Sequence, residues 1–199
     1  MVKVEIGGGV IPRAGFINLD YKDHILVHHK VNFNTDRFPF EDDTVDQIYS
    51  NHCLEHLNKG YGGFLHCVEE MWRISKPNAY WYIRVPYFNS HHTMSNPFHT
   101  NNIFNEYTFH YFSDEHKTQL NSNVNVRKGS CFEYEFKATL KVEKIEYEFF
   151  DNYAYLSAHN DAKIATITHQ YNNVVDNICY HIKAEKPDFW QKEIVRNRK

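Results

Sequence analysis

The sequence predicts an α/β fold built on one mostly parallel sheet, with an antiparallel pair of strands at one edge. Three observations support this class. Short apolar runs rich in β-branched and aromatic residues recur through the first 50 residues. An amphipathic helical segment at 61–75 is followed by a longer apolar run. The stretch 132–150 alternates between charged and apolar residues, as antiparallel strands with one solvated face do.

The first strands are short, and the turn after the first of them is rich in glycine. Three glycines follow it directly, which indicates a turn that must approach another group closely. The four strand candidates in this part of the chain are Val2–Ile6, Phe16–Tyr21, Ile25–Phe33 and Val45–Ser50.

The predicted helix Tyr61–Ser75 carries an apolar face and stops at Lys76-Pro77-Asn78, because proline cannot continue a helix. The fifth strand, Ala79–Phe88, comes next. A polar, aromatic and histidine-rich stretch then runs from Asn89 to Glu115. It is too long for a simple connection, so we expect a substrate lid there. A second helix is predicted within Ala162–Ile182.

Length and composition favour one domain without a polymeric nucleic-acid partner. The 199 residues, 42% of them hydrophobic, can bury one substantial core. The 22 basic and 25 acidic residues leave a net charge of −3, so no excess of positive charge is available for a phosphate backbone. The chain has no run of eighteen apolar residues and no signal pattern at its start, and we expect a cytoplasmic protein that does not enter a membrane.

The four cysteines favour reduced, structural thiols. They are widely spaced and follow no metal-binding or redox pattern. They are Cys53, Cys67, Cys131 and Cys179.

The most informative segment, Asp36–Leu57, reads DRFPFEDDTVDQIYSNHCLEHL. It joins an acidic turn, an apolar strand and the start of a helix. In this it resembles the "LPF, acidic turn, FD, strand, LEHL" line of class I S-adenosylmethionine-dependent methyltransferases, in a short branch of the type 11-like members. The helix end at Glu70, Arg73 and Lys76-Pro77 is similar to the family's "E-x-x-R-x-L-K-P-G-G" line. Asn78 and Ala79 replace its two glycines, and asparagine tolerates the left-handed turn.

The resemblance implies a Rossmann-like methyltransferase sheet and S-adenosyl-L-methionine as cofactor. We therefore interpret 1–199 as a single methyltransferase domain, with a cofactor-binding half at about 1–88. The lid would occupy about 89–115, and the edge strands and a C-terminal helix would occupy 130–199.

The same resemblance assigns cofactor roles to residues near the glycine turn. Glu5 would take the ammonium group of the cofactor, Asp20 its two ribose hydroxyls and Arg13 its carboxylate. Ordinary strand-end acids and a surface arginine remain the alternatives. Pro12 stands where a dinucleotide-binding turn would place its third glycine, which disfavours a nicotinamide or flavin enzyme. The expected cofactor-binding residues are Glu5, Gly7, Gly8, Gly9, Arg13, Asp20, Asn34, Asp36, Asn51 and His52.

Four histidines on loops after the fourth and fifth strands are the candidates for a general base. A neutral imidazole near pH 7 can accept the proton of an acceptor hydroxyl. Ordinary hydrogen bonding within the lid is the alternative. No ordered histidine spacing with carboxylates is present, so we expect no metal. The candidates are His52, His91, His92 and His99.

The resemblance further implies O-methylation of a sugar hydroxyl in glycan biosynthesis. Two alternatives stay open: another small molecule or natural product as acceptor, and a non-catalytic methyltransferase-like binding domain. The expected partner is a saccharide or other small molecule. A second copy of the chain, or a neighbouring domain of a longer polypeptide, is also kept open.

One departure from the family pattern concerns the connections between the first strands. Six residues separate Gly9 from Phe16, and three separate Tyr21 from Ile25. A parallel crossover normally needs a dozen or more. We therefore expect the helices on one sheet face to be missing or reduced. An apolar sheet face is not left in water, so we expect the lid, the helix within Ala162–Ile182 or a second copy of the chain to cover it.

Overall fold

The computed structural model of the protein describes residues 1–60, 62–99, 101–114, 137–158 and 161–186, and the statements below concern these residues. Cys131 and the predicted strand residues 132–136 lie outside them, as do Tyr61 and Glu115 at the ends of the predicted helix and lid.

A seven-stranded sheet runs through the molecule in the order β3-β2-β1-β4-β5-β7-β6. The first five strands are mutually parallel, whereas β7 is antiparallel to both of its neighbours. This confirms a mostly parallel Rossmann-like sheet with an antiparallel pair at one edge. The strands are β1 (Lys3–Ile6), β2 (Ile17–Asp20), β3 (His29–Lys30), β4 (Val45–Asn51), β5 (Ser75–Pro86), β6 (Thr139–Phe149) and β7 (Val175–Glu185).

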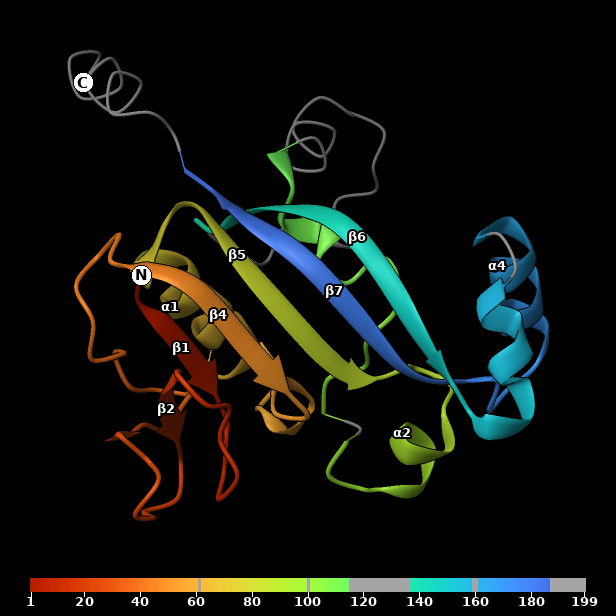
Figure 1. Cartoon of the computed structure of the whole chain (residues 1–199), viewed down its shortest axis with the longest axis horizontal. Helices are drawn as coiled ribbons and strands as arrows, with labels where there is room; N and C mark the ends of the chain where they lie inside the picture. The colour runs from red at the N-terminus through yellow and green to blue at the C-terminus, as the bar shows by residue number, and fades with distance from the viewer. Residues whose placement is uncertain (61, 100, 115–136, 159–160, 187–199) are drawn as a thin grey trace.

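Helices join the later strands of the sheet. The longest, α1, lies against one sheet face (Figure 1) and buries its apolar side there. None of the described helices is long and apolar enough to cross a bilayer. The helices are η1 (Leu54–His56), α1 (Phe64–Ile74), α2 (His91–Ser95), η2 (His110–Phe112), η3 (Asp151–Ala158) and α4 (Asp161–Gln170).

The edge pair is built from different residues than the sequence predicted. Its described part within 132–150 is one continuous strand, β6, and the partner strand β7 comes from 175–185. The alternating pattern therefore belongs to a single long strand with one solvated face. The predicted helix within Ala162–Ile182 exists only as α4, which ends at Gln170. Asn173, in the left-handed region at φ 60°, lies in the turn that leads into β7.

The third strand is also shorter than predicted, because side-chain contacts hold most of it as a loop. Asn18 donates from Nδ2 to the carbonyl of Leu26 at 3.0 Å, and Nδ1 of the His28 ring accepts the backbone N–H of Asn18 at 3.0 Å. Only His29–Lys30 pairs as a strand, with the end of β2. Two residues are enough to position the cavity-lining loop that follows.

An ion-paired clamp explains why the Phe-Pro-Phe turn and the helix motif occur together. Glu70 accepts the backbone N–H of Phe38 at 2.8 Å. Arg73 binds Glu70 through two nitrogens and donates to the carbonyls of Phe38 and Phe40. The turn is thereby fixed to α1. Asn78 has the expected left-handed conformation, at φ 63°, but it lies within β5, which begins at Ser75 rather than at the predicted Ala79. The pairing of β5 with β4 shifts register in this part of the strand.

The connections between the first strands contain no helix. Residues 7–16 join β1 to β2, and residues 21–28 join β2 to β3. This confirms the predicted loss of helices. Side chains from β2 serve the turn instead: Asn18 accepts the N–H of Gly8 at 3.1 Å and donates to the carbonyl of Gly9 at 3.1 Å, and Asp20 accepts the N–H of Gly9 at 2.9 Å.

The face opposite α1 carries no helix among the described residues (Figure 1), but it is not apolar. Tyr49, Tyr82 and His181 are half-buried there, and the rings of Tyr49 and Tyr82 stack with centroids 5.3 Å apart. Alternate positions of β4, β5 and β7 thus place polar and aromatic side chains on this face. The expectation of an apolar face needing cover was wrong.

The two segments of the chain that were expected to cover this face lie elsewhere. Phe104 and Phe109 of the lid contact Phe64 of α1, on the helical side of the sheet. The carbonyl of Thr168 in α4 accepts a hydrogen bond from Asn89, beyond the end of β5. Both segments therefore leave the tyrosine-rich face open.

Replacing Asn18 with alanine should destabilise the fold by about 3 kcal/mol, because the fully buried amide makes three hydrogen bonds to the backbone of the first two connections. Chemical denaturation measures the change in the free energy of unfolding. The exposed Asn172 provides the matched control, and Asn172→Ala should stay within about 0.5 kcal/mol of the wild type. Equal stabilities of the two variants would contradict this role for Asn18.

Candidate active site

A cavity of about 330 Å³ opens where β1, β2 and β4 end. Its volume falls within the range of about 300–1,000 Å³ common for small-molecule sites. In an α/β sheet, ligands bind outside the carboxyl ends of the parallel strands, which is where this cavity lies. The lining residues are Gly7, Asp20, Tyr21, Asn32, Phe33, Asn34, His52, Cys53, His56 and Leu57.

The glycine turn forms the wall of the cavity nearest β1. Gly7 has a φ of +76°, and a Cβ atom there would stand 2.5 Å from the sulfur of Cys53. Gly8 is confined by its neighbours, since a Cβ would stand 2.5 Å from Oδ1 of Asn18. Only a backbone without side chains fits at these two positions. Burial raises the pKa of the Cys53 thiol, which therefore stays protonated as a small apolar wall of the cavity.

The two predicted acidic ligands differ in where they lie. Asp20 lines the cavity and accepts backbone N–H groups from Gly9 and Lys22, both at 2.9 Å. Each carboxylate oxygen keeps a second lone pair for a ligand hydroxyl. Glu5 does not line the cavity and instead accepts the backbone N–H of Arg13. Burial raises the pKa of Glu5, although that hydrogen bond opposes the shift.

Of the predicted cofactor-binding residues Asn34 and Asp36, the first lines the cavity and the second supports the loop. Oδ1 of Asn34 accepts the backbone N–H of Asn58 at 2.8 Å, while its amide nitrogen donates to Asn32 at 3.2 Å. Asp36 accepts the backbone N–H of Asn32 at 2.9 Å. Asn32 and Phe33, which the sequence analysis missed, complete this wall. Their position between β3 and the Phe-Pro-Phe turn was the available signal.

The structure separates the remaining predicted cofactor residues. His52 lines the cavity in a left-handed conformation at φ 50°. Asn51 accepts a hydrogen bond from Arg84 at 3.0 Å. The guanidinium of Arg13 lies 3.9 Å from the ring centroid of Tyr49, on the face opposite α1. In this conformation it does not reach the cavity.

These residues fit the cofactor that the sequence resemblance implies. Gly7 presents bare backbone to the cavity, and Asp20 presents a carboxylate that can accept two hydroxyls. Tyr21, Phe33 and Leu57 give the cavity apolar walls for an aromatic ring.

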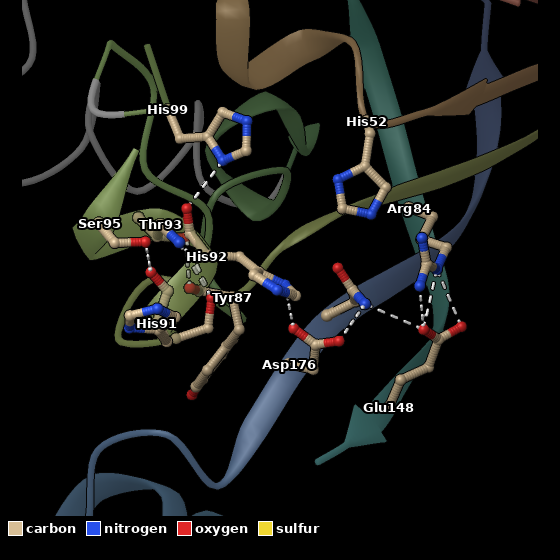
Figure 2. Close-up of polar contacts among 12 residues, drawn as sticks. His52, Arg84, Tyr87, His91, His92, Thr93, Ser95, His99, Glu148 and Asp176 are labelled. Carbon is tan, nitrogen blue, oxygen red and sulfur yellow. Dashed lines mark hydrogen bonds and ion pairs between the residues drawn. The ribbon is translucent and has the colours of Figure 1, made fainter. Parts of the chain in front are cut away.

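The four candidate histidines occupy different surroundings. Nδ1 of His92 lies 2.7 Å from Oδ1 of Asp176, an ion-pair contact drawn in Figure 2. His99 contacts the carbonyl of His92 through Nδ1 at 2.9 Å. The exposed His91 points away from the others, and its carbonyl accepts the Ser95 hydroxyl. His52 reaches this region from the loop after β4.

A polar network connects the ends of four strands beside His92 (Figure 2). Nε of Arg84 lies 2.9 Å and 3.0 Å from the two carboxylate oxygens of Glu148, and this hydrogen-bonded contact lowers the pKa of Glu148. Asn177 donates to both Glu148 and Asp176 at 3.1 Å. The sequence analysis missed Asp176, Arg84 and Glu148, because they lie on strands whose pairing the sequence did not reveal.

The three described cysteines, Cys53, Cys67 and Cys179, are buried free thiols, in agreement with their predicted structural role. They make no disulfide, and burial raises the pKa of Cys179 to about 11.

Residues 16–83 match the family model described as a methyltransferase domain. A search of curated proteins found no significant match to the chain. Among solved structures, an S-adenosylmethionine-dependent methyltransferase from Archaeoglobus fulgidus is similar, with a TM-score of 0.54 and 13% identity over 92% of this chain and 85% of that one. Phosphoethanolamine N-methyltransferase 2 of Haemonchus contortus, in complex with S-adenosyl-L-methionine, has a TM-score of 0.52 and 10% identity over 94% of this chain and 49% of that one.

At such low identity the two solved structures establish the fold alone, and the methyltransferase domain match is confined to residues 16–83. The matched segment spans β2 to β5 and includes the acidic turn, the histidine after β4 and helix α1. Together, the domain match over residues 16–83 and the shared fold support an S-adenosylmethionine-dependent methyltransferase.

Proposed function

We propose that the protein methylates a hydroxyl of a sugar or sugar-containing small molecule in glycan biosynthesis, with His92 as general base. The observation that carries the proposal is the contact between His92 and Asp176 at the sheet edge where the cofactor cavity opens. Among the four candidate histidines, His92 is the one with a carboxylate from a neighbouring strand beside its ring.

Bound S-adenosylmethionine would supply an electrophilic methyl group on a sulfonium. Gly7 would let the methionine part lie against the backbone, and Asp20 would accept the ribose hydroxyls. Asn34 would present an amide to the adenine edge. Gly8, Gly9 and Glu5 would act indirectly, by fixing the turn.

Asp176 would orient the imidazole of His92. The contact at 2.7 Å does not have the geometry of a hydrogen bond, because Oδ1 of Asp176 has no hydrogen-bond partner among the described residues. The carboxylate would favour a proton on Nδ1, and this would leave the lone pair on Nε2 free to accept the acceptor's hydroxyl proton. Asn177 holds the other oxygen of Asp176, and Glu148 holds Asn177. The base is thereby connected to the strands of the sheet, so its direction does not depend on the lid alone.

The groups beside His92 support a hydroxyl-rich acceptor. Arg84, Glu148 and Asn177 offer donors and acceptors of hydrogen bonds within one network. A sugar presents several hydroxyls, each of which both donates and accepts. Phe88 and Phe150, near the same edge, offer partly buried ring surface on which a sugar ring could pack.

Replacing Asp20 with alanine should weaken S-adenosylmethionine binding about tenfold or more, because charge-assisted hydrogen bonds of about 1.5 to 3 kcal/mol are lost. Equilibrium dialysis with labelled cofactor measures the dissociation constant. Asp23→Ala, in the exposed loop after β2, is the matched control and should bind like the wild type. Unchanged affinity in a folded Asp20 variant would remove this residue from the cofactor site.

Replacing His92 with alanine should lower kcat about a hundredfold or more while leaving cofactor affinity nearly unchanged. Asp176→Asn should lower kcat less, because the imidazole keeps its place but loses the carboxylate beside it. The exposed His110 in η2 is the control, and His110→Ala should retain wild-type turnover. Near-normal turnover of His92→Ala would eliminate it as the base.

A panel of nucleotide sugars, glycosides and small aromatic or amine acceptors tests the substrate class. Release of S-adenosylhomocysteine gives the rate, and mass spectrometry with NMR of the product gives the methylated atom. We expect an O-methyl sugar. A product methylated on nitrogen, or turnover confined to acceptors without a sugar, would contradict the proposal. Cofactor binding without turnover on any acceptor would favour a non-catalytic domain.

A further inference from the structure

A buried carboxylate without a hydrogen-bond partner lies at the edge of the cofactor cavity. Glu55, in η1, has a side chain that is 1% exposed. Neither of its carboxylate oxygens accepts a hydrogen bond from any residue that the structure describes. A buried charge in this state is costly unless a cation offsets it.

Three imidazoles surround this carboxylate. Nδ1 of His52 is 3.2 Å and Nε2 of His56 is 4.0 Å from Oε1 of Glu55. The rings of His56 and His99 meet with centroids 4.6 Å apart. Glu55, His56 and His99 each offer one ligand atom, and these three atoms lie within 4.8 Å of one another. The group combines η1 with the lid, two segments that are far apart in the sequence.

The tautomer of His99 is set for coordination. Its Nδ1 faces the carbonyl of His92 at 2.9 Å, and a carbonyl can only accept, so Nδ1 carries the proton and Nε2 carries a free lone pair. Metal-binding histidines usually donate their other ring N–H in this way.

We propose that Glu55, His56 and His99 bind one divalent transition-metal ion, with Zn²⁺ as the best fit. Two imidazoles and one carboxylate are typical ligands for zinc, whereas magnesium and calcium prefer oxygen ligands throughout. Three protein ligands leave a fourth position for water or for His52. In a tetrahedral site with metal–ligand bonds of about 2.0 Å, the ligand atoms lie about 3.3 Å from one another. The three side chains must therefore move toward one another by about 1 Å when the metal binds.

Such a shift is accessible, because the side chain of His56 is 44% exposed and that of His99 is only partly buried. The site would fasten the lid to η1 at the mouth of the cofactor cavity. Asn102 of the lid already makes two hydrogen bonds to that segment, to the carbonyls of Leu54 and Leu57. A metal would strengthen the same connection. The proposed metal site does not depend on His92 being the general base.

Tag-free protein stripped with chelator should bind one equivalent of Zn²⁺ in a calorimetric titration and raise its Tm on doing so. Co²⁺ should give the visible spectrum of a low-coordinate nitrogen and oxygen site without a thiolate charge-transfer band, which excludes the cysteines as ligands. Mg²⁺ should produce neither effect. These readouts need neither cofactor nor acceptor, so they stand apart from methyltransferase activity.

Glu55→Gln and His99→Ala should each weaken Zn²⁺ binding about a hundredfold or more, whereas the control His110→Ala should bind like the wild type. Circular dichroism shows whether each variant is folded, and the nearly isosteric Glu55→Gln keeps the packing of η1. Absence of stoichiometric Zn²⁺ binding by the wild type, or unchanged affinity in both folded variants, would overturn the proposal.

Discussion

The hydrogen bonds from the side chains of β2 to the glycine turn are the interaction on which the cofactor side of this protein depends. Methyltransferase sheets of this class pair parallel strands, and parallel strands normally need a helix in the crossover. Residues 7–16 contain none, so the turn has no helix to hold it. Asn18 and Asp20 bind the N–H groups of Gly8 and Gly9 instead. A short connection therefore keeps the shape of a cofactor site at the end of β1.

The loss of these helices also decides the character of the opposite sheet face. Helices usually cover both faces of a parallel sheet, and its strands are then apolar on both sides. Here the uncovered side carries Tyr49, Tyr82 and His181, with Arg13 stacked on the first of these rings. Such side chains tolerate water at their polar ends while their rings pack. The face can therefore remain open, and it draws Arg13 away from the cofactor cavity.

Sequence patterns within short segments predicted much of this structure. The parts that were predicted wrongly depend on which distant strands pair with one another. Continuous motifs such as the glycine turn and the Phe-Pro-Phe segment placed β1, β4, α1 and β5 from sequence alone. Asp20, Asn34 and His52 were found because Asp20 ends β2, Asn34 lies in the loop after β3, and His52 directly follows β4. The partner strand of β6 could not be predicted, because the alternation of charged and apolar residues in 132–150 fits one long strand as well as two short ones. Asp176 was missed for the same reason: it becomes a neighbour of His92 only when β7 pairs with β5.

The central claim is that side chains have replaced the missing helices without loss of the cofactor site. Isothermal titration of the wild-type protein with S-adenosylhomocysteine tests it most directly, because that ligand contains the adenine, ribose and amino-acid parts without the reactive methyl group. The account predicts saturable binding of one molecule per chain. An absence of binding heat, together with an unchanged Tm at millimolar ligand, would contradict it.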